Sequence, residues 1–279
     1  MSSACRRGKV SFAILLCVMV CRVAQAVPAS FALLMPDTLA AWEAYLNPFE
    51  AILRNPVEAT APFLLVDEDP RRKSEAARGK VAIWPGKRGA TVAVPHGLIH
   101  DWLGAVFVPR ATLKDVWAVA RNYEKFPDWY GPTIVQGRRL ASLPEGDGEV
   151  SSIRYVRRVM FVTATLDVDF ENRYVQMSPL RWYSVSRSIR MREKDESKNA
   201  DGPSRPEQGD GYVWRIYTFT RYEETDGGVY LEQESLALSR PIPASLHWLI
   251  DPVVRRLAKD LLEKSLTQTR EAVEGELGK

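Results

Sequence analysis

Two periodic patterns of apolar and polar residues dominate the second half of the chain. Apolar and polar side chains alternate along Val162–Phe170, which predicts a strand with one buried and one solvent-exposed face. Further strand candidates are Trp182–Arg192, Tyr212–Tyr222 and Val229–Leu238. Because Asp226-Gly227-Gly228 is a tight-turn signal, we expect the last two to pair as an antiparallel hairpin.

The segment Pro243–Val273 has a helical period instead. Its apolar stripe is formed by Leu246, Leu249, Ile250, Val253, Val254, Leu257, Leu261, Leu262 and Leu266. This spacing predicts an amphipathic helix buried along one side. Asp251-Pro252 lies inside it, and proline behind an aspartate cap indicates a helix that kinks or restarts there.

The first half of the chain is less regular. Residues 36–54 have a rough helical apolar face, with Pro48 expected to kink or restart the helix. Phe63–Val66 is a short strand candidate, and Lys80–Trp84 and Thr91–Val94 are predicted to form a hairpin.

The main sheet is expected to begin later in the chain. Trp102–Val108 is the candidate for its first strand, and Thr112 can cap a helix that runs to Tyr123. The polar segment Glu193–Asp210 is predicted to be a loop.

The N-terminus has the layout of an export signal. Basic residues precede the apolar run Val10–Val20, and Ala24-Gln25-Ala26 has the small-x-small form of a cleavage site. We therefore expect residues 1–26 to be a signal peptide and the protein to be periplasmic or secreted. A retained membrane anchor is the alternative, which the shortness of the run disfavours because a spanning helix needs about 20 apolar residues.

Cysteines and excess charge both lie in this leader. Its cysteines are Cys5, Cys17 and Cys21, so the mature chain would have no disulfide and no thiolate nucleophile. The leader also holds four basic residues and no acid, which accounts for the net charge of +3. A near-neutral mature protein lacks the electrostatic footprint of a nucleic-acid-binding protein.

The remaining chain is long enough for one domain with an extension. We expect an extension containing a helix and a hairpin over residues 27–95, and a main domain over residues 96–279. The predicted fold class is α+β, with a curved antiparallel sheet wrapped around the long C-terminal helix.

Two segments, Val116–Trp129 and Leu238–Trp248, carry a likeness to a known family. The first is similar to the helix-to-turn signature after the first strand of the START-related superfamily, and the second resembles the entry to its final helix. This superfamily, also called Bet v 1-like or SRPBCC, includes polyketide cyclases and lipid-transport proteins. The resemblance covers about residues 102–273. It implies a helix-grip fold with a cavity between sheet and last helix for a lipid, sterol, quinone, polyketide or similar ligand. It assigns no catalytic residue, because one fold hosts many functions.

Arg187 is the best single candidate for a polar group in such a cavity. It lies in phase with the apolar residues of its own strand, which are Tyr183, Val185, Ile189 and Met191. A charge on an apolar face costs several kcal/mol unless it is paired, so Arg187 could hold a ligand's carboxylate or phosphate. The alternative is a rim position or a structural ion pair with Glu232 or Glu234.

The other ligand-binding candidates come from three places, and the first is the strand of Arg187, with Tyr183, Val185 and Ile189. Arg215 and Tyr217 lie on the next strand, where an aromatic residue is more often packing, and Trp248 lies at the entry to the final helix.

The sequence offers little else for catalysis. His96 and His100 have the spacing of a helical metal pair, but Pro95 and Gly97 disfavour a helix and no third ligand is placed. There is neither a Gly-x-Ser-x-Gly elbow nor a Gly-x-Gly-x-x-Gly loop. We therefore expect no metal and no cofactor.

These observations favour an exported, non-catalytic protein that binds or carries a lipid-like hydrophobic molecule. Transient contact with a membrane is compatible with this interpretation. The first alternative is a polyketide cyclase or aromatase-like enzyme that uses Arg187 to hold an oxyanion. The second is an interaction module that docks a partner through residues 27–95.

Overall fold

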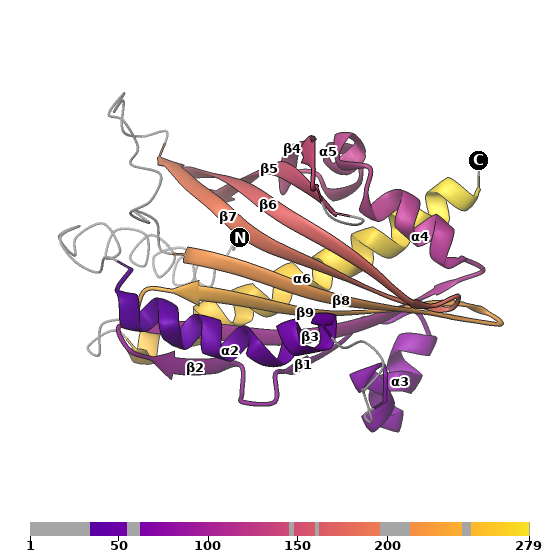
Figure 1. The fold of residues 1–279 in the computed structure, drawn as a ribbon, viewed down its shortest axis with the longest axis horizontal. Coiled ribbons are helices and arrows are strands. Elements are labelled where there is room, and N and C mark those ends of the chain that lie inside the picture. The colour runs from indigo at the N-terminus through magenta and orange to yellow at the C-terminus, as the bar shows by residue number, and fades with distance from the viewer. Residues whose placement is uncertain are drawn as a thin grey trace, which may run out of the picture.

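The computed structural model describes residues 34–54, 62–144, 148–159, 162–195, 213–241 and 247–278. The predicted signal peptide and most of the predicted loop Glu193–Asp210 lie outside these ranges. Within them, helices lie on both sides of a curved antiparallel sheet (Figure 1). The predicted α+β class is therefore confirmed.

The described residues form a nine-stranded sheet. Its strands are β1 (Ala82–Pro85), β2 (Thr91–Val94), β3 (Gly97–Pro109), β4 (Ile134–Ser142), β5 (Gly148–Val159), β6 (Val162–Ser178), β7 (Arg181–Asp195), β8 (Val213–Thr225) and β9 (Gly228–Ser239). The order across the sheet is β1-β3-β9-β8-β7-β6-β5-β4, and β2 also pairs with β3.

Helical segments cover the sheet and connect its strands. They are α2 (Pro36–Arg54), η1 (Leu65–Glu68), α3 (Pro70–Ala77), α4 (Leu113–Ala120), η2 (Tyr123–Lys125), α5 (Phe126–Tyr130) and α6 (His247–Leu277). None of the described helices is long and apolar enough to cross a membrane.

The sheet has an inner face, which we define as the face toward α6. Gly104 of β3 lies directly beneath this helix, and a Cβ there would come within 2.5 Å of Leu266 Cδ1. Next to this contact, Leu262 and Leu266 pack with Val106 and Leu231 in one buried cluster. The absence of a side chain at Gly104 therefore allows α6 to approach the sheet closely.

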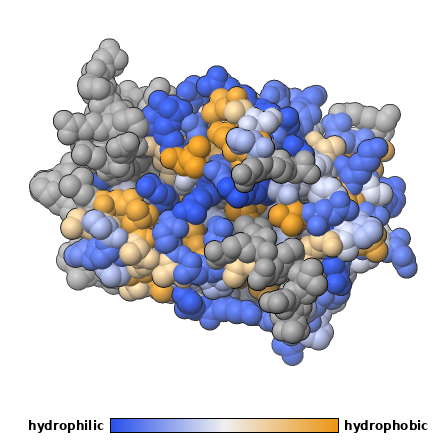
Figure 2. Space-filling view, viewed as in Figure 1, coloured by the Kyte–Doolittle hydropathy of each residue, from blue (hydrophilic) through white to orange (hydrophobic). Residues whose placement is uncertain are grey.

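The opposite, outer face is covered in part by α2. Trp42, Leu46 and Phe49 of this helix belong to the same buried cluster as Tyr217 and Phe219 of β8. In Figure 1, α2 passes in front of the sheet and α6 passes behind it. The surface on the α2 side is largely hydrophilic, with separate apolar patches (Figure 2).

Two predictions for the first half of the chain are wrong. Strands β1 and β2 do not form a hairpin with each other, because each pairs with β3 along the same edge. Asp101 separates the two pairings, and its backbone bonds to Gly86 and Ala90. The predicted strand Phe63–Val66 gives way to η1, whose first amides donate to the Glu232 carboxylate instead of to a strand.

Several local predictions are confirmed. The β8–β9 hairpin forms, and Gly228 at its turn has φ +149° and lies so close to Val108 O that a Cβ would clash. Thr112 caps α4 in a reciprocal capping box with Asp115. Both α2 and α6 run as single helices, the first through Pro48 and the second through Asp251-Pro252. Neither helix therefore restarts at its proline, and a kink there stays a prediction.

Candidate functional site

Two rows of polar or small residues cross the inner face in register. One row consists of Tyr174, Ser184, Thr220, Gln233 and Gly104, and the next of Asn172, Ser186, Thr218, Ser235 and Trp102. In the centre of the sheet, Ser186, Thr218 and Ser235 are only half-buried although α6 lies on this face. Short side chains do not fill the layer between sheet and helix as leucines would, so this strip stays accessible.

Apolar residues flank the strip on both sides. Toward the β8–β9 turn lies the cluster that contains Tyr222, Leu231 and the leucines of α6. Toward β5 lies a second cluster, in which Val168 and Phe170 pack with Tyr130 of α5. The inner face therefore combines a hydrogen-bonding strip with hydrocarbon on either side.

An aromatic group closes one end of the strip. The ring of Trp117 in α4 contacts the rings of Tyr174 and Trp182 edge-on, at centroid distances of 4.6 and 4.5 Å. The indole Nε1 groups of Trp102 and Trp182 are buried and have no hydrogen-bond partner within the described part of the chain. A buried donor without an acceptor is costly, so these two N–H groups are suited to an acceptor atom from outside the chain.

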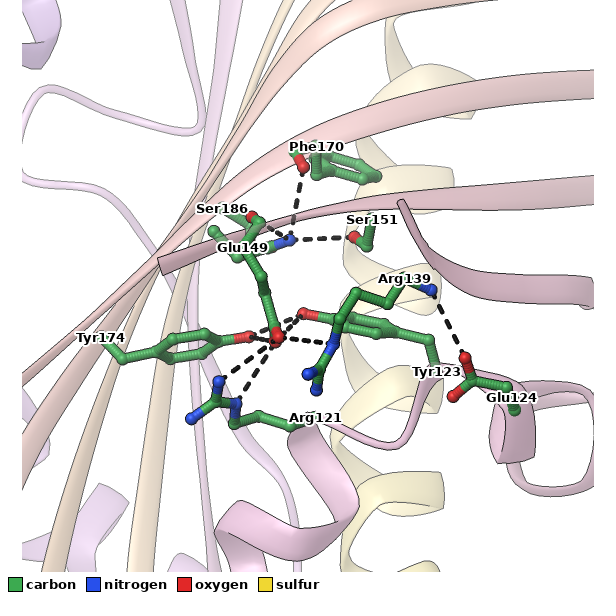
Figure 3. Close-up of polar contacts among 10 residues, drawn as sticks. Arg121, Tyr123, Glu124, Arg139, Glu149, Ser151, Phe170, Tyr174 and Ser186 are labelled. Carbon is green, nitrogen blue, oxygen red and sulfur yellow. Dashed lines mark hydrogen bonds and ion pairs between the residues drawn. The ribbon is translucent and has the colours of Figure 1, made fainter. Parts of the chain in front are cut away.

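Glu149 lies beside the strip and collects four polar partners (Figure 3). Its side chain is 1% exposed. Arg121 and Arg139 form ion pairs with it at 3.3 and 2.7 Å, and the hydroxyls of Tyr123 and Tyr174 each donate to Oε1 at 2.9 Å. These partners come from the end of α4, from η2, β4 and β6, so one carboxylate joins four elements to the start of β5.

The partners keep Glu149 ionised. Burial by itself raises the pKa of this carboxyl, but the hydrogen bonds from Arg121, Tyr123 and Tyr174 outweigh burial and hold its pKa below the ordinary value. Burial raises the pKa of both tyrosines, and in Tyr174 the neighbouring Tyr123 adds to the shift. Both hydroxyls therefore remain neutral donors.

Asn172 connects this cluster to the strip. Its Nδ2 donates to Ser151 Oγ at 2.9 Å, and its Oδ1 accepts from Ser186 Oγ at 2.7 Å. Each of these side chains is thereby fixed in one orientation, which prearranges the polar surface before any ligand arrives.

Five of the predicted ligand-binding side chains point away from this face. Tyr183, Val185 and Tyr217 lie on the outer face, in the cluster with α2, and Arg187 is in register with Tyr217. Arg215 is on the same side, because its partner Leu238 belongs to that cluster. The prediction that these residues face the C-terminal helix is wrong.

For the residues of β7, a bulge in that strand is the physical reason. Asp169 faces Arg190 and Phe170 faces Ser188, so Ile189 is an extra residue without a partner on β6. The alternation therefore changes phase there: Met191 lies with the inner cluster, whereas Tyr183 and Val185 lie outside. Ile189 itself is 54% exposed. That the predicted residues of β7 and β8 bind a ligand stays a prediction. Their position on the outer face gives no support for contact with a ligand under α6.

The described partners of Arg187 come from α2. Its guanidinium contacts the carboxylates of Glu43 and Glu50, whereas Glu232 and Glu234 are both close to Arg221. The structural ion pair weighed as the alternative is thus present, but with acids that the sequence did not indicate.

The other candidates are placed as follows. Trp248 lies in the first turn of α6, and its side chain lies outside the described residues. His96 lies in the β2–β3 turn and His100 in β3, so they share no helix. Among the described residues, no group of three or more histidine, cysteine or acidic side chains is placed to hold a metal ion.

Comparison with known proteins gives structural neighbours only. No family model and no curated protein matches the chain. Human STARD10 is similar at 13% identity over 73% of this chain and 76% of that chain, with a TM-score of 0.47. The fold is similar to that of START-domain proteins.

Two further structural neighbours are a lipid transfer protein and an aromatase/cyclase. A STAR-related lipid transfer protein from Xanthomonas axonopodis matches at 14% identity over 68% of this chain and 98% of that chain, with a TM-score of 0.43. Zhui aromatase/cyclase from a Streptomyces species matches at 14% identity over 64% and 96%, with a TM-score of 0.41. The START-related family named from the sequence thus recurs among the structural neighbours.

Sequence reasoning missed the Glu149 cluster, although a signal was present. Glu149 alternates in phase with Ile153 and Tyr155, which face the inner apolar cluster. An acid in phase with buried apolar residues is the same signal that drew attention to Arg187.

Proposed function

We propose that the inner face binds one lipid-like, amphipathic small molecule between the sheet and α6, and that the protein binds or carries it without chemical change. The observation that carries this proposal is the half-buried polar strip of Ser186, Thr218 and Ser235 between two apolar clusters. Apolar flanks favour a hydrocarbon body, and precisely placed polar groups favour a fixed orientation.

The polar groups indicate the chemistry of the ligand. The indole N–H groups of Trp102 and Trp182 are buried donors that lack an acceptor in the described chain. Serine and threonine hydroxyls can donate as well as accept. The ligand would therefore present hydrogen-bond acceptors, such as carbonyl, ester or hydroxyl oxygens, on an otherwise apolar frame.

Catalysis is less well supported than binding. The inner-face carboxylate of Glu149 is held ionised by two arginines and two tyrosine hydroxyls, which makes it a weak base. Arg187, the proposed oxyanion holder of the cyclase alternative, lies on the outer face with α2. Export stays a prediction from residues 1–26.

Native mass spectrometry of the purified full-length protein tests the proposal. We expect a noncovalent adduct of lipid-like mass, which organic extraction releases and fragmentation identifies. Protein that stays free of such an adduct, and that takes up none from a mixture of extracted cellular lipids, would contradict the proposal.

A matched pair of variants locates the ligand. Ser235→Phe adds a ring to the half-buried inner strip, whereas Ser142→Phe makes the same change at an exposed position of β4. We expect the first variant to lose most of the adduct and the second to keep it, with both retaining the circular dichroism spectrum of the native sheet. Equal adduct levels in the two folded variants would place the ligand elsewhere.

A further inference from the structure

A separate polar site lies on the outer face, beyond the residues of β7, β8 and β9 that pack against α2. Strands β4 to β7 bring two rows of side chains into register there. One row is Gln136, Arg154, Asp167 and Arg192, and the other is Arg138, Ser152, Asp169 and Arg190. They lie on the outer face because Asp167 and Asp169 alternate with Val168 and Phe170 of the inner cluster.

The centre of this site is acidic and its surroundings are basic. Asp167 and Asp169 are 8% and 5% exposed. Arg154 forms a bidentate pair with Asp167, with N–O distances of 2.6 and 2.9 Å, and Arg190 pairs with Asp169. Four arginines thus surround two aspartates, and the site has a net charge of +2 at neutral pH.

The other two arginines, Arg138 and Arg192, form no ion pair with these aspartates among the contacts described. Arg138 is exposed, and Arg192 is half-buried with a buried Nε that has no hydrogen-bond partner in the described ranges. A hollow of about 50 Å³ lies between them, lined by Gln136, Arg138, Ser152, Arg154, Asp167 and Arg192. A buried guanidinium N–H without an acceptor is unfavourable. Asp167, the carboxylate in the lining, is paired with Arg154, so the Nε of Arg192 is suited to an anion from outside the described chain.

We propose that this hollow binds a phosphate group. Guanidinium groups match the oxygens of phosphate in planar, charge-assisted pairs, and the hollow receives them from three strands. The hydroxyl of Ser152 and the amide of Gln136 supply neutral donors. Asp167 holds Arg154 in place, which reduces the side-chain entropy lost on binding. The phosphate could belong to a soluble anion or to a phospholipid headgroup.

Calorimetric titration of the full-length protein with inorganic phosphate, at constant ionic strength set by chloride, tests the site. We expect saturable binding that Arg192→Gln weakens by about tenfold or more, since the charge-assisted hydrogen bonds from this guanidinium to phosphate are lost. The control is Arg181→Gln, which removes the same charge from the far end of β7, where Arg181 pairs with Glu223. Its affinity should stay within about twofold of the wild type. Binding that both variants weaken equally, or no saturable binding, would overturn the proposal.

A vesicle experiment identifies the source of the phosphate. Phosphatidylcholine vesicles with and without phosphatidic acid, which carries a phosphomonoester, are floated with the wild type and with Arg192→Gln. Weaker flotation of the variant together with weaker phosphate binding supports a lipid headgroup. Unchanged flotation of the variant with weaker phosphate binding supports a soluble anion. A variant that behaves like the wild type in both assays overturns the proposed phosphate site. Neither assay involves the inner-face ligand, so the result is independent of the proposed function.

Discussion

Glu149 connects segments that are distant in the sequence. Its carboxylate receives side chains from the end of α4, from η2, from β4 and from β6. Two arginines and two tyrosines satisfy a group that would otherwise be a buried, uncompensated charge. We expect this residue to matter more for stability than any surface ion pair.

Glu149→Gln should therefore destabilise the protein by about 3 kcal/mol, because removing one partner of a buried pair leaves the others unpaired. Glu171→Gln is the control, since Glu171 and its partner Arg173 are 30% and 64% exposed. This control should change stability by less than about 1 kcal/mol. Urea denaturation measures both, and similar values for the two variants would contradict the role given to Glu149.

Glu234 is a residue of the opposite kind, a buried acid with few compensating charges. It lies on the outer face with Asp101, Glu232 and Arg221, where the Tyr45 hydroxyl donates to Asp101 at 2.7 Å. Burial, followed by the charge of Asp101, raises the pKa of Glu234 to about 8. The native state therefore keeps a proton that the unfolded chain releases near pH 4.5.

This proton makes stability fall as the pH rises. Between pH 5 and 8 the native state binds more protons than the unfolded state, so the free energy of unfolding should decline by a few kcal/mol and then level off. Glu234→Gln should flatten this decline, whereas Glu68→Gln, at a side chain that is 45% exposed, should not. Urea denaturation from pH 5 to 9 measures the slope, and a parallel decline in Glu234→Gln would exclude Glu234 as its source.

At the scale of elements, the bulge of β7 decides which side chains meet. Side chains alternate between the two faces of the sheet both before and after Ile189. Because Ile189 is an extra residue, odd-numbered residues before it lie on the outer face and odd-numbered residues after it lie on the inner face. Tyr183 and Val185 thereby reach α2, and Met191 reaches the inner cluster. Ile189 contributes by its backbone, since its side chain is exposed.

Deleting Ile189 should cost more than about 3 kcal/mol, because one part of β7 must then present its apolar residues to the wrong face. Ile189→Ala keeps the backbone count and removes only an exposed side chain, so its effect should stay within about 0.5 kcal/mol. Chemical denaturation of both variants measures the difference. A deletion variant as stable as Ile189→Ala would mean that the bulge does not fix the register.

The same bulge shows where sequence reasoning succeeds and where it stops. The β8–β9 turn, the Thr112 cap and the alternation of β6 depend on residues that are neighbours in the chain, and all three were predictable. The face on which Arg187 lies depends on one unpaired residue whose side chain carries no signal. The Glu149 cluster was missed because its partners are 10 to 28 positions away and meet only when the sheet curves.

At the scale of the whole molecule, the N-terminal segment is built into the fold. Strands β1 and β2 extend the sheet along β3, and α2 buries Trp42 and Leu46 to 1% and 0% exposure against the outer face. A helix that docked a separate partner would keep an apolar stripe free. The apolar side of α2 is instead used within the chain.

Leu46→Ala distinguishes these two roles. A helix that belongs to the core should lose about 2–5 kcal/mol on this change, from lost burial and the cavity left behind. Leu261→Ala is a matched control in α6, because Leu261 is 44% exposed, and it should cost well under 1 kcal/mol. Equilibrium denaturation in urea measures both changes. An unfolding free energy that Leu46→Ala leaves unchanged would show that α2 packs too weakly to hold the outer face, and it would restore the interpretation of this helix as a docking element.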